Sequence, residues 1–343
     1  MVDVLMEYGL FLAKAVTVVA AIGVSAGVLF ALSRRARPPE RLEINNLNKK
    51  YEAMAQALKR SVLSKKDFKK QARVEKTRKK TEAKQKKKAA KERKRVFVVH
   101  FRGDIKATAV TSLREEITAV LTLAKSDDEV LLCLENAGGL VHEHGLAASQ
   151  LLRIRDRKIP LTVAVDKVAA SGGYLMASVA DRIIAAPFAV IGSIGVLAQL
   201  PNFHRLLDRH GIGFEQVKAG EFKRTVTVFG KNTEKERKKL KQEIEDTHAL
   251  FKNFVATHRP SLNMKRVSTG EHWYGTRALD LKLVDKLMTS DDYLLTASEA
   301  ADLYEVSYTA RKRVGERLVS AMQSTLENLF TAWSARTAGS RAM

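Results

Sequence analysis

The sequence predicts an α/β fold with a largely parallel sheet in the central part of the chain. Short apolar runs alternate along residues 96–200 with longer segments that have helical spacing. Small-residue turns containing paired glycines follow two of the predicted strands. The formal charge of +22 is concentrated outside this part. The central part itself has nearly equal numbers of acidic and basic residues, as an ordinary globular domain does. Strands that alternate with helices are typical of parallel sheets.

Residues 1–33 have the pattern of a membrane anchor. Residues 15–32 form an 18-residue stretch without a charged side chain, directly before the basic residues that begin at Arg34. This length suffices for a transmembrane helix. A cleaved signal peptide is the alternative, but the first seven residues carry Asp3 and Glu7 and lack the positive charge of an n-region. We therefore expect a retained helix and a lipid bilayer as partner.

Residues 34–95 form a strongly basic segment. They contain 25 Lys and Arg against 7 Asp and Glu, a net of +18, whereas the remaining chain has 35 against 31, a net of +4. Apolar residues are sparse, which predicts a solvated, partly helical stalk that contacts anionic lipid headgroups. The segment has one Tyr and one Phe for base stacking, so we expect no nucleic acid partner.

Residues 96–290 are predicted to form the compact domain. We expect strands at 96–101, 129–135 and 160–165, and helices at 113–124 and 146–155. The single cysteine, Cys133, excludes a disulfide framework and is expected in the core.

A second long apolar run covers residues 183–200. Pro187, Gly192, Ser193 and Gly195 interrupt it at intervals that suit short buried strands and turns. We therefore predict buried strands here and not a second membrane span.

Residues 291–343 are predicted to be a C-terminal extension. Within it, residues 314–333 have apolar side chains at spacings of three and four, which predicts an amphipathic helix. Packing on the domain or on a neighbouring subunit is the common role of such a helix, and a membrane surface is the alternative.

Two glycine-containing turns are candidates for chemistry. Residues 168–174 read Val-Ala-Ala-Ser-Gly-Gly-Tyr, so Ser171 is expected at a helix N-terminus, where N–H groups and the helix dipole can face a developing oxyanion. Serine is also a preferred N-cap, and many helices begin this way without catalysis. Residues 136–139, Asn-Ala-Gly-Gly, can present N–H groups to a cleft, although alone they indicate only a turn.

A serine nucleophile needs a base, and no histidine is an obvious one. The eight histidines mostly stand singly, without an aspartate at a telling spacing. A lysine can serve if burial lowers its pKa from ~10.4 to about 7–8. Lys223 lies among apolar residues in 220–228, although a lysine in such a place is usually a solvated charge.

Several short motifs, in this order, resemble the signal peptide peptidase SppA family, and most closely its SohB-type members, bacterial inner-membrane proteases. The motifs are ASGGY at 170–174, AP at 186–187, IGSIGV at 191–196, Lys223, LVH at 140–142, GLAASQ at 145–150, TGEHWYG at 269–275 and ALDLKLVD at 278–285. The resemblance extends from the anchor to about residue 287. It implies a crotonase/ClpP-like fold that works without cofactor or metal.

The resemblance also implies a site. Ser171 would be the nucleophile and Lys223 the general base, with Ser193 orienting the lysine amine. The N–H groups of Gly138 and Gly172 would form the oxyanion hole. It further implies peptide or membrane-protein substrates and a homo-oligomer in which serine and lysine can come from different protomers.

Two positions depart from the family pattern. The family usually has Ser-Pro before the first oxyanion glycine, where this chain has Asn136-Ala137, so the hole is expected to be less preformed. Lys282 replaces a glycine that commonly precedes Leu-Val-Asp, which affects only a surface turn.

The function and the membrane orientation have alternatives. A crotonase-fold acyl-CoA enzyme would share the oxyanion glycines and stay active without Ser171, and a membrane scaffold would have no activity. The arginines that follow the anchor place the domain in the cytoplasm by the positive-inside rule, whereas the family resemblance favours the periplasm.

Overall fold

The structure, a computed structural model, describes residues 6, 8–21, 23, 41–71, 73–74, 77 and 93–309. The chain divides into two compact units, residues 42–308 and residues 1–41 with 309–343. Residues 8–21 of the second unit are helical. Of the helices in the described ranges, none meets the length and hydropathy required to cross a membrane. The predicted span continues beyond these residues, and the predicted helix at 314–333 lies wholly outside them, so both stay predictions.

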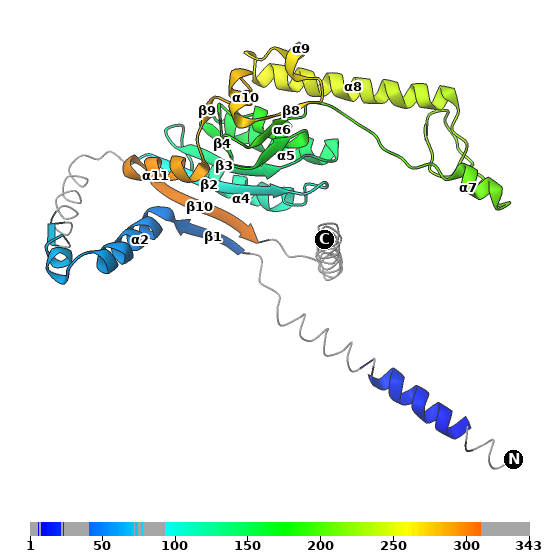
Figure 1. Cartoon of the computed structure of the whole chain (residues 1–343), viewed down its shortest axis with the longest axis horizontal. Helices are drawn as coiled ribbons and strands as arrows, with labels where there is room; N and C mark the ends of the chain where they lie inside the picture. The colour runs from blue at the N-terminus through cyan, green and yellow to red at the C-terminus, as the bar shows by residue number, and fades with distance from the viewer. Residues whose placement is uncertain are drawn as a thin grey trace, which may run out of the picture. The chain divides into compact units, whose positions relative to one another are not determined.

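The larger unit alternates strands and helices (Figure 1). Its strands are β1 (Arg41–Asn46), β2 (Arg95–Gly103), β3 (Glu129–Asn136), β4 (Leu161–Val165), β5 (Val168–Ala170), β6 (Arg182–Ala185), β7 (Val190–Gly192), β8 (His272–Tyr274), β9 (Lys286–Leu287) and β10 (Asp302–Thr309). Its helices are α2 (Leu47–Val62), α4 (Val110–Leu123), α5 (Val141–Asp156), α6 (Gly172–Ser178), α7 (His204–Arg209), α8 (Glu234–His258), α9 (Met264–Val267), α10 (Gly275–Asp280) and α11 (Ser290–Ala300).

The described strands form one mixed sheet. Its main order is β1-β10-β2-β3-β4-β6-β9, and β5, β7 and β8 branch from it through a pairing of β5 with β3. The neighbours of β2, β3, β4 and β6 run parallel to them, and β5 is parallel to both β3 and β7. The β7–β8 pair is antiparallel. The predicted α/β fold with a largely parallel sheet is confirmed.

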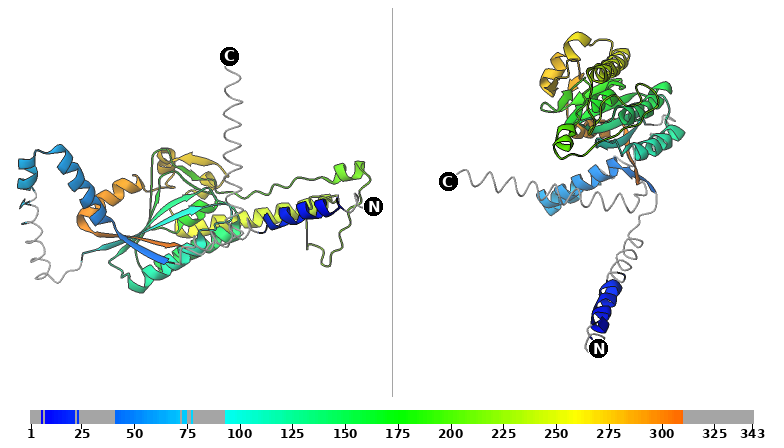
Figure 2. Two further views of the ribbon diagram at one scale, coloured as in Figure 1. Left: turned by 90° about the horizontal axis from the view of Figure 1, so that it is seen from below. Right: turned by 90° about the vertical axis from the view of Figure 1, so that its right-hand side faces the viewer.

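Both faces of the sheet are covered by helices. Along β2, Phe97, Val99 and Phe101 join the core that includes α4, α5, α6 and the C-terminal part of α8, whereas Val96 and Val98 pack with residues of α2 and α11. This alternation follows from the period of two in a strand. Figure 2 shows α2 on one side of the sheet and α8 on the other. Burial on both faces explains why the strands are continuously apolar.

The compact unit begins earlier than the sequence predicted. Part of the expected stalk folds as β1, next to β10, and as α2, in which Leu47 is buried. Asn48 donates to the carbonyl oxygen of Ala301 over 3.0 Å and accepts the N–H of Leu303 over 2.7 Å. A few apolar and amide side chains at the start of α2 are thus enough to attach it to the sheet, and residues 291–308 of the predicted extension belong to the same unit.

The apolar run at 183–200 divides in two. Its first part forms β6 and β7, which are largely buried as predicted, although Phe188 in the turn between them is exposed. From Leu197 onward the apolar side chains are exposed. We call residues 197–233, which lead out to α7 and back to the start of α8, the arm (Figure 1).

Candidate active site

Three neighbouring parallel strands end together. β5 lies between β3 and β7, where Ala169 is level with Asn136 of β3 and Ala170 with Gly192 of β7. Carboxyl ends of parallel strands are where open α/β sheets bind ligands. Each of these ends is followed within two residues by a predicted site residue: Gly138, Ser171 and Ser193.

Ser171 occupies a strained turn between β5 and α6. Its φ of 51° and ψ of −119° are unusual for a residue with a side chain, and it makes no side-chain cap hydrogen bond to α6. Its N–H instead donates to the carbonyl oxygen of Gly192 over 2.8 Å. The serine is therefore not an ordinary N-cap. A strained residue held by the sheet is typical of functional positions.

Gly138 and Gly172 lie directly against this serine. A Cβ on Gly138, whose φ is +93°, would stand 2.6 Å from the Cβ of Ser171 and 2.8 Å from the nitrogen of Gly172. A Cβ on Gly172 would meet the ring of His144 at 2.4 Å. Both positions therefore require glycine, and with Ser193, which follows β7, four of the five predicted site residues lie at this sheet edge.

The Gly138 N–H has a partner that sequence reasoning missed. It donates to Oδ1 of Asn136 over 2.6 Å, and Nε2 of His144 lies 3.2 Å from the same oxygen. Asn136 and His144 are 1% and 0% exposed. Asparagine two residues before a glycine is a common turn signal, but nothing in the sequence pairs Asn136 with His144.

The helix that carries Ser171 is fixed from behind. Every residue of α6 is buried, and the hydroxyl of Tyr174 donates to the carbonyl oxygen of Leu283 over 2.9 Å. Burial raises the pKa of Tyr174 well above its ordinary value. Arg259, at the end of α8, forms a bidentate ion pair with Asp285 close by. These contacts hold the N-terminus of α6 against the sheet.

Ser193 is the first residue after β7 and lies beside Ser171. Its φ is also positive, 52°, and its N–H donates to the carbonyl oxygen of Glu271 over 2.7 Å. It follows Gly192, whose carbonyl oxygen holds the Ser171 N–H. Ser193 is thus placed at the same sheet edge as the serine nucleophile candidate.

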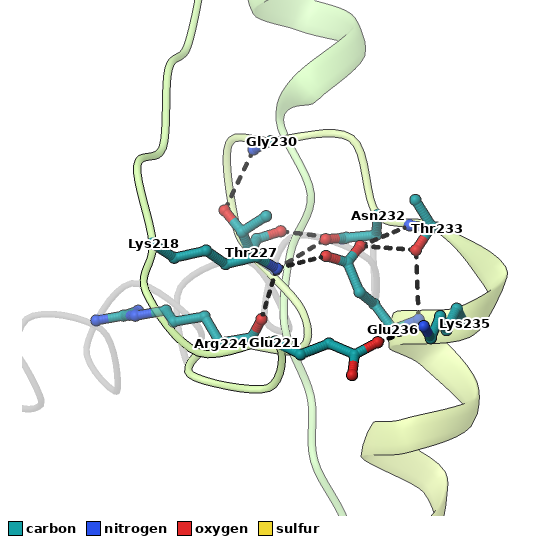
Figure 3. A network of polar contacts seen from close by, with 9 residues as sticks. All are labelled: Lys218, Glu221, Arg224, Thr227, Gly230, Asn232, Thr233, Lys235 and Glu236. Atoms are coloured by element: carbon teal, nitrogen blue, oxygen red, sulfur yellow. Dashed lines mark hydrogen bonds and ion pairs between the residues drawn. The ribbon is translucent and has the colours of Figure 1, made fainter.

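Lys223 is not at this edge. It is an exposed residue of the arm, in a turn where its N–H donates to the carbonyl oxygen of Gly220 over 3.2 Å. The arm is tied to the first turns of α8 (Figure 3) by ion pairs of Lys218 with Glu236 and of Glu221 with Lys235. Thr233 and Glu236 form a capping box that starts the helix, and the N–H of Thr233 helps hold the pKa of Glu236 at about 2.

The length of α8 separates Lys223 from the serines. Phe222, its neighbour, has the Lys239 amine 5.2 Å from its ring centroid. His248, whose Nε2 lies 3.2 Å from the carbonyl oxygen of Ile194, is further along the same helix. The rise of an α-helix places these two helix positions about 14 Å apart. Within one chain, the arm next to Lys223 thus contacts the N-terminal half of α8, whereas the loop after β7 contacts its C-terminal half.

In the described part of the chain, no hydrogen bond joins the Ser171 hydroxyl to a lysine, histidine or carboxylate. That part also contains no group of three or more side chains suited to a metal ion. A single copy thus shows a serine with two adjacent glycines but without its base.

Comparison with known proteins identifies the family. The models of "Peptidase family S49 N-terminal" and "Peptidase family S49" match residues 3–151 and 153–304. "Probable protease SohB" of Haemophilus influenzae is 44% identical over 347 residues, 97% of each chain. The protein of the same name from Buchnera aphidicola subsp. Schlechtendalia chinensis is 46% identical over 303 residues, 86% of this chain and 99% of that one. The chain belongs to peptidase family S49, and these two relatives are similar to it over nearly their whole length.

One similar solved structure is a lysine-to-alanine mutant of the 1510-N membrane-bound stomatin-specific protease in complex with a substrate peptide. The match covers 68% of this chain and 100% of the protease chain. The identity is 14% and the TM-score 0.43.

Proposed function

We propose that this S49 peptidase is a membrane-anchored serine endopeptidase in which Ser171 is the nucleophile and Lys223 the general base. The observation that carries the proposal is the strained Ser171, pressed between Gly138 and Gly172 at the carboxyl ends of β3, β5 and β7. A crotonase/ClpP-like fold, which the family resemblance implies, is proposed for the unit that carries this serine. Membrane-associated or signal-peptide-like peptides are the proposed substrates.

The chemistry follows from these residues. An unprotonated Lys223 amine takes the proton of the Ser171 hydroxyl, and the oxygen attacks the peptide carbonyl carbon. The resulting oxyanion accepts hydrogen bonds from the N–H groups of Gly172 and Gly138. The amine of the cleaved peptide bond takes this proton from Lys223 and leaves. Water then hydrolyses the acyl ester on Ser171. Ser193 is proposed to orient the lysine amine.

The lysine is proposed to come from a second copy of the chain. Lys223 extends away from its own serine on an arm that is rich in exposed apolar residues: Leu197, Leu200, Phe203, Leu206, Ile212, Phe214, Val217, Phe222 and Phe229. Val217 is fully exposed. Such a surface favours burial against a partner. A homo-oligomer that covers the arm could bring each Lys223 to a neighbouring Ser171.

The location is proposed from the sequence pattern. The uncharged stretch at 15–32 would anchor the chain in the bacterial inner membrane, with the lipid bilayer as partner. The side on which the peptidase unit lies stays open between periplasm and cytoplasm.

The test combines an active-site probe with base variants. Full-length chain extracted in detergent is treated with a fluorophosphonate, and labelled peptides are sequenced by mass spectrometry. We expect a single label on Ser171, lost in Ser171→Ala. Lys223→Arg keeps the charge but is an ineffective base, so labelling and peptide hydrolysis should both be lost. Lys231→Arg, an exposed lysine of the same arm, is the matched control and should keep both.

Two outcomes would contradict the proposal. A folded wild-type protein without label on Ser171 would favour a scaffold or an acyl-CoA enzyme. Turnover by Lys223→Arg at a rate close to that of Lys231→Arg would show that another group is the base.

A further inference from the structure

The Gly138 N–H, which the proposed function assigns to the oxyanion hole, is engaged elsewhere in this structure. It donates to Oδ1 of Asn136 over 2.6 Å, a short hydrogen bond within the loop itself. An N–H with an intramolecular acceptor at this distance is poorly oriented toward a second one. Stabilisation of the oxyanion therefore competes with the Asn136 carboxamide.

Asn136 itself has no room to move. A Cβ at Gly103 would lie 2.2 Å from its Nδ2, and a Cβ at Gly173 would lie 2.1 Å from its carbonyl oxygen. Its Nδ2 lies 3.8 Å from the sulfur of Met176, and His144 reaches its Oδ1 from the other side. The acceptor is therefore a fixed part of the buried interior.

The peptide between Ala137 and Gly138 ends in a glycine, which carries no side chain that would hinder its rotation. Gly138 has a φ of +93° and no Cβ, so its backbone can rotate with little steric cost. Beyond it the loop is pinned again, because the N–H of Leu140 donates to the carbonyl oxygen of Ile105 over 2.9 Å. A rotation that frees the Gly138 N–H would thus involve only the short segment between Asn136 and Leu140.

We propose that the Asn136 carboxamide, held by His144, is a latch that retains the Gly138 N–H in the resting peptidase, and that catalysis requires this N–H to turn from Asn136 to the substrate oxyanion. Asn136 is a positioning residue, since it acts through Gly138 and does not touch the reacting atoms. The inference rests on the proposed roles of Ser171 and Gly138.

The test measures how fast a fluorophosphonate labels Ser171 in the full-length chain. In this reaction the Ser171 oxygen bonds to phosphorus, fluoride leaves, and the phosphonyl oxygen occupies the oxyanion hole. Asn136→Leu keeps the size but removes the acceptor, so the latch predicts faster labelling, by about two- to ten-fold. Asn136→Asp gives a charged acceptor that holds the N–H more strongly, so labelling should slow by about ten-fold.

The opposite directions separate a latch from a structural role, which would slow both variants. Asn48→Asp is the matched control, because Asn48 also accepts a buried backbone N–H, that of Leu303, away from the site. It should label at the wild-type rate. Melting temperatures show which variants fold, and if Asn136→Leu does not, Asn136→Ala, which also removes the acceptor and should also label faster than wild type, takes its place.

The latch would be overturned if folded Asn136→Leu were labelled no faster than wild type. It would also be overturned if folded Asn136→Asp were labelled as fast as wild type. Failure of the wild type itself to label at Ser171 would instead overturn the proposed function, on which the latch depends.

Discussion

The N–H of Ser171 donates to the carbonyl oxygen of Gly192 over 2.8 Å, and this bond holds the ends of β5 and β7 at one level. The strained backbone of Ser171 is therefore maintained by the sheet and not by a cap of its own helix. The same bond places Ser193 next to the nucleophile candidate. The effect of the strained backbone on stability should then be measurable separately from the role of the Ser171 hydroxyl in catalysis.

The first prediction concerns this strain. Ser171→Gly and Ser171→Ala should both abolish fluorophosphonate labelling and peptide hydrolysis. Because glycine adopts a positive φ without cost, Ser171→Gly should be more stable than Ser171→Ala by about 1 kcal/mol. Denaturant unfolding of both variants measures the difference. An alanine variant at least as stable as the glycine variant would show that the turn is not strained.

A second prediction tests the glycine beside the serine. A Cβ at Gly138 would stand 2.6 Å from that of Ser171, so Gly138→Ala should displace the loop and lower kcat by at least about 100-fold. Gly145→Ala in α5 is the control. A Cβ there meets nothing within 4 Å, so this variant should keep activity and gain about 0.5–1 kcal/mol of stability. Equal activity of the two variants would remove Gly138 from the site.

The third prediction concerns a buried carboxyl in α4. Glu116 is 5% exposed and accepts the N–H of Tyr308 over 2.8 Å, and burial raises its pKa to about 7. Between pH 4.5 and 7 the folded chain keeps this proton while the unfolded chain loses it, so the contribution of Glu116 to stability falls as pH rises.

Glu116→Gln imitates the protonated form at every pH. As pH rises from 5 to 8, the free energy of unfolding of Glu116→Gln should therefore increase relative to that of wild type by about 2 kcal/mol. Urea unfolding at both values measures this change. Glu115→Gln, at an exposed position of the same helix, should follow the wild type throughout. A stability difference between Glu116→Gln and wild type that does not change with pH would contradict the assignment.

The sequence predicts the fold well because apolar periodicity reports burial directly. The strands at 96–101, 129–135 and 160–165 correspond to β2, β3 and β4 within two residues. The addition of β1 and α2 was missed because their attachment depends on a few side chains within a basic segment. Lys282, noted as a replacement for glycine, has a φ of +63°, the backbone that a glycine would favour.

The site is predictable only in part. Glycines and small residues at strand ends predict the turns that contain Gly138, Ser171 and Gly172 because the backbone geometry there is local, whereas the roles of these residues rest on the family resemblance. The bond between Asn136 and Gly138 and the approach of His144 depend on how α5 packs against α6, which no sequence pattern encodes. The distance of Lys223 from Ser171 depends on the direction of the arm, which apolar composition does not reveal.

The central claim is that each active site combines Ser171 of one chain with Lys223 of another. The most direct measurement mixes two inactive variants, Ser171→Ala and Lys223→Ala, in detergent under conditions of subunit exchange, and follows peptide hydrolysis. The account predicts that part of the wild-type activity returns, because some interfaces in mixed oligomers hold an intact pair. Mixed oligomers that are demonstrated by differently tagged chains and show no activity would contradict it.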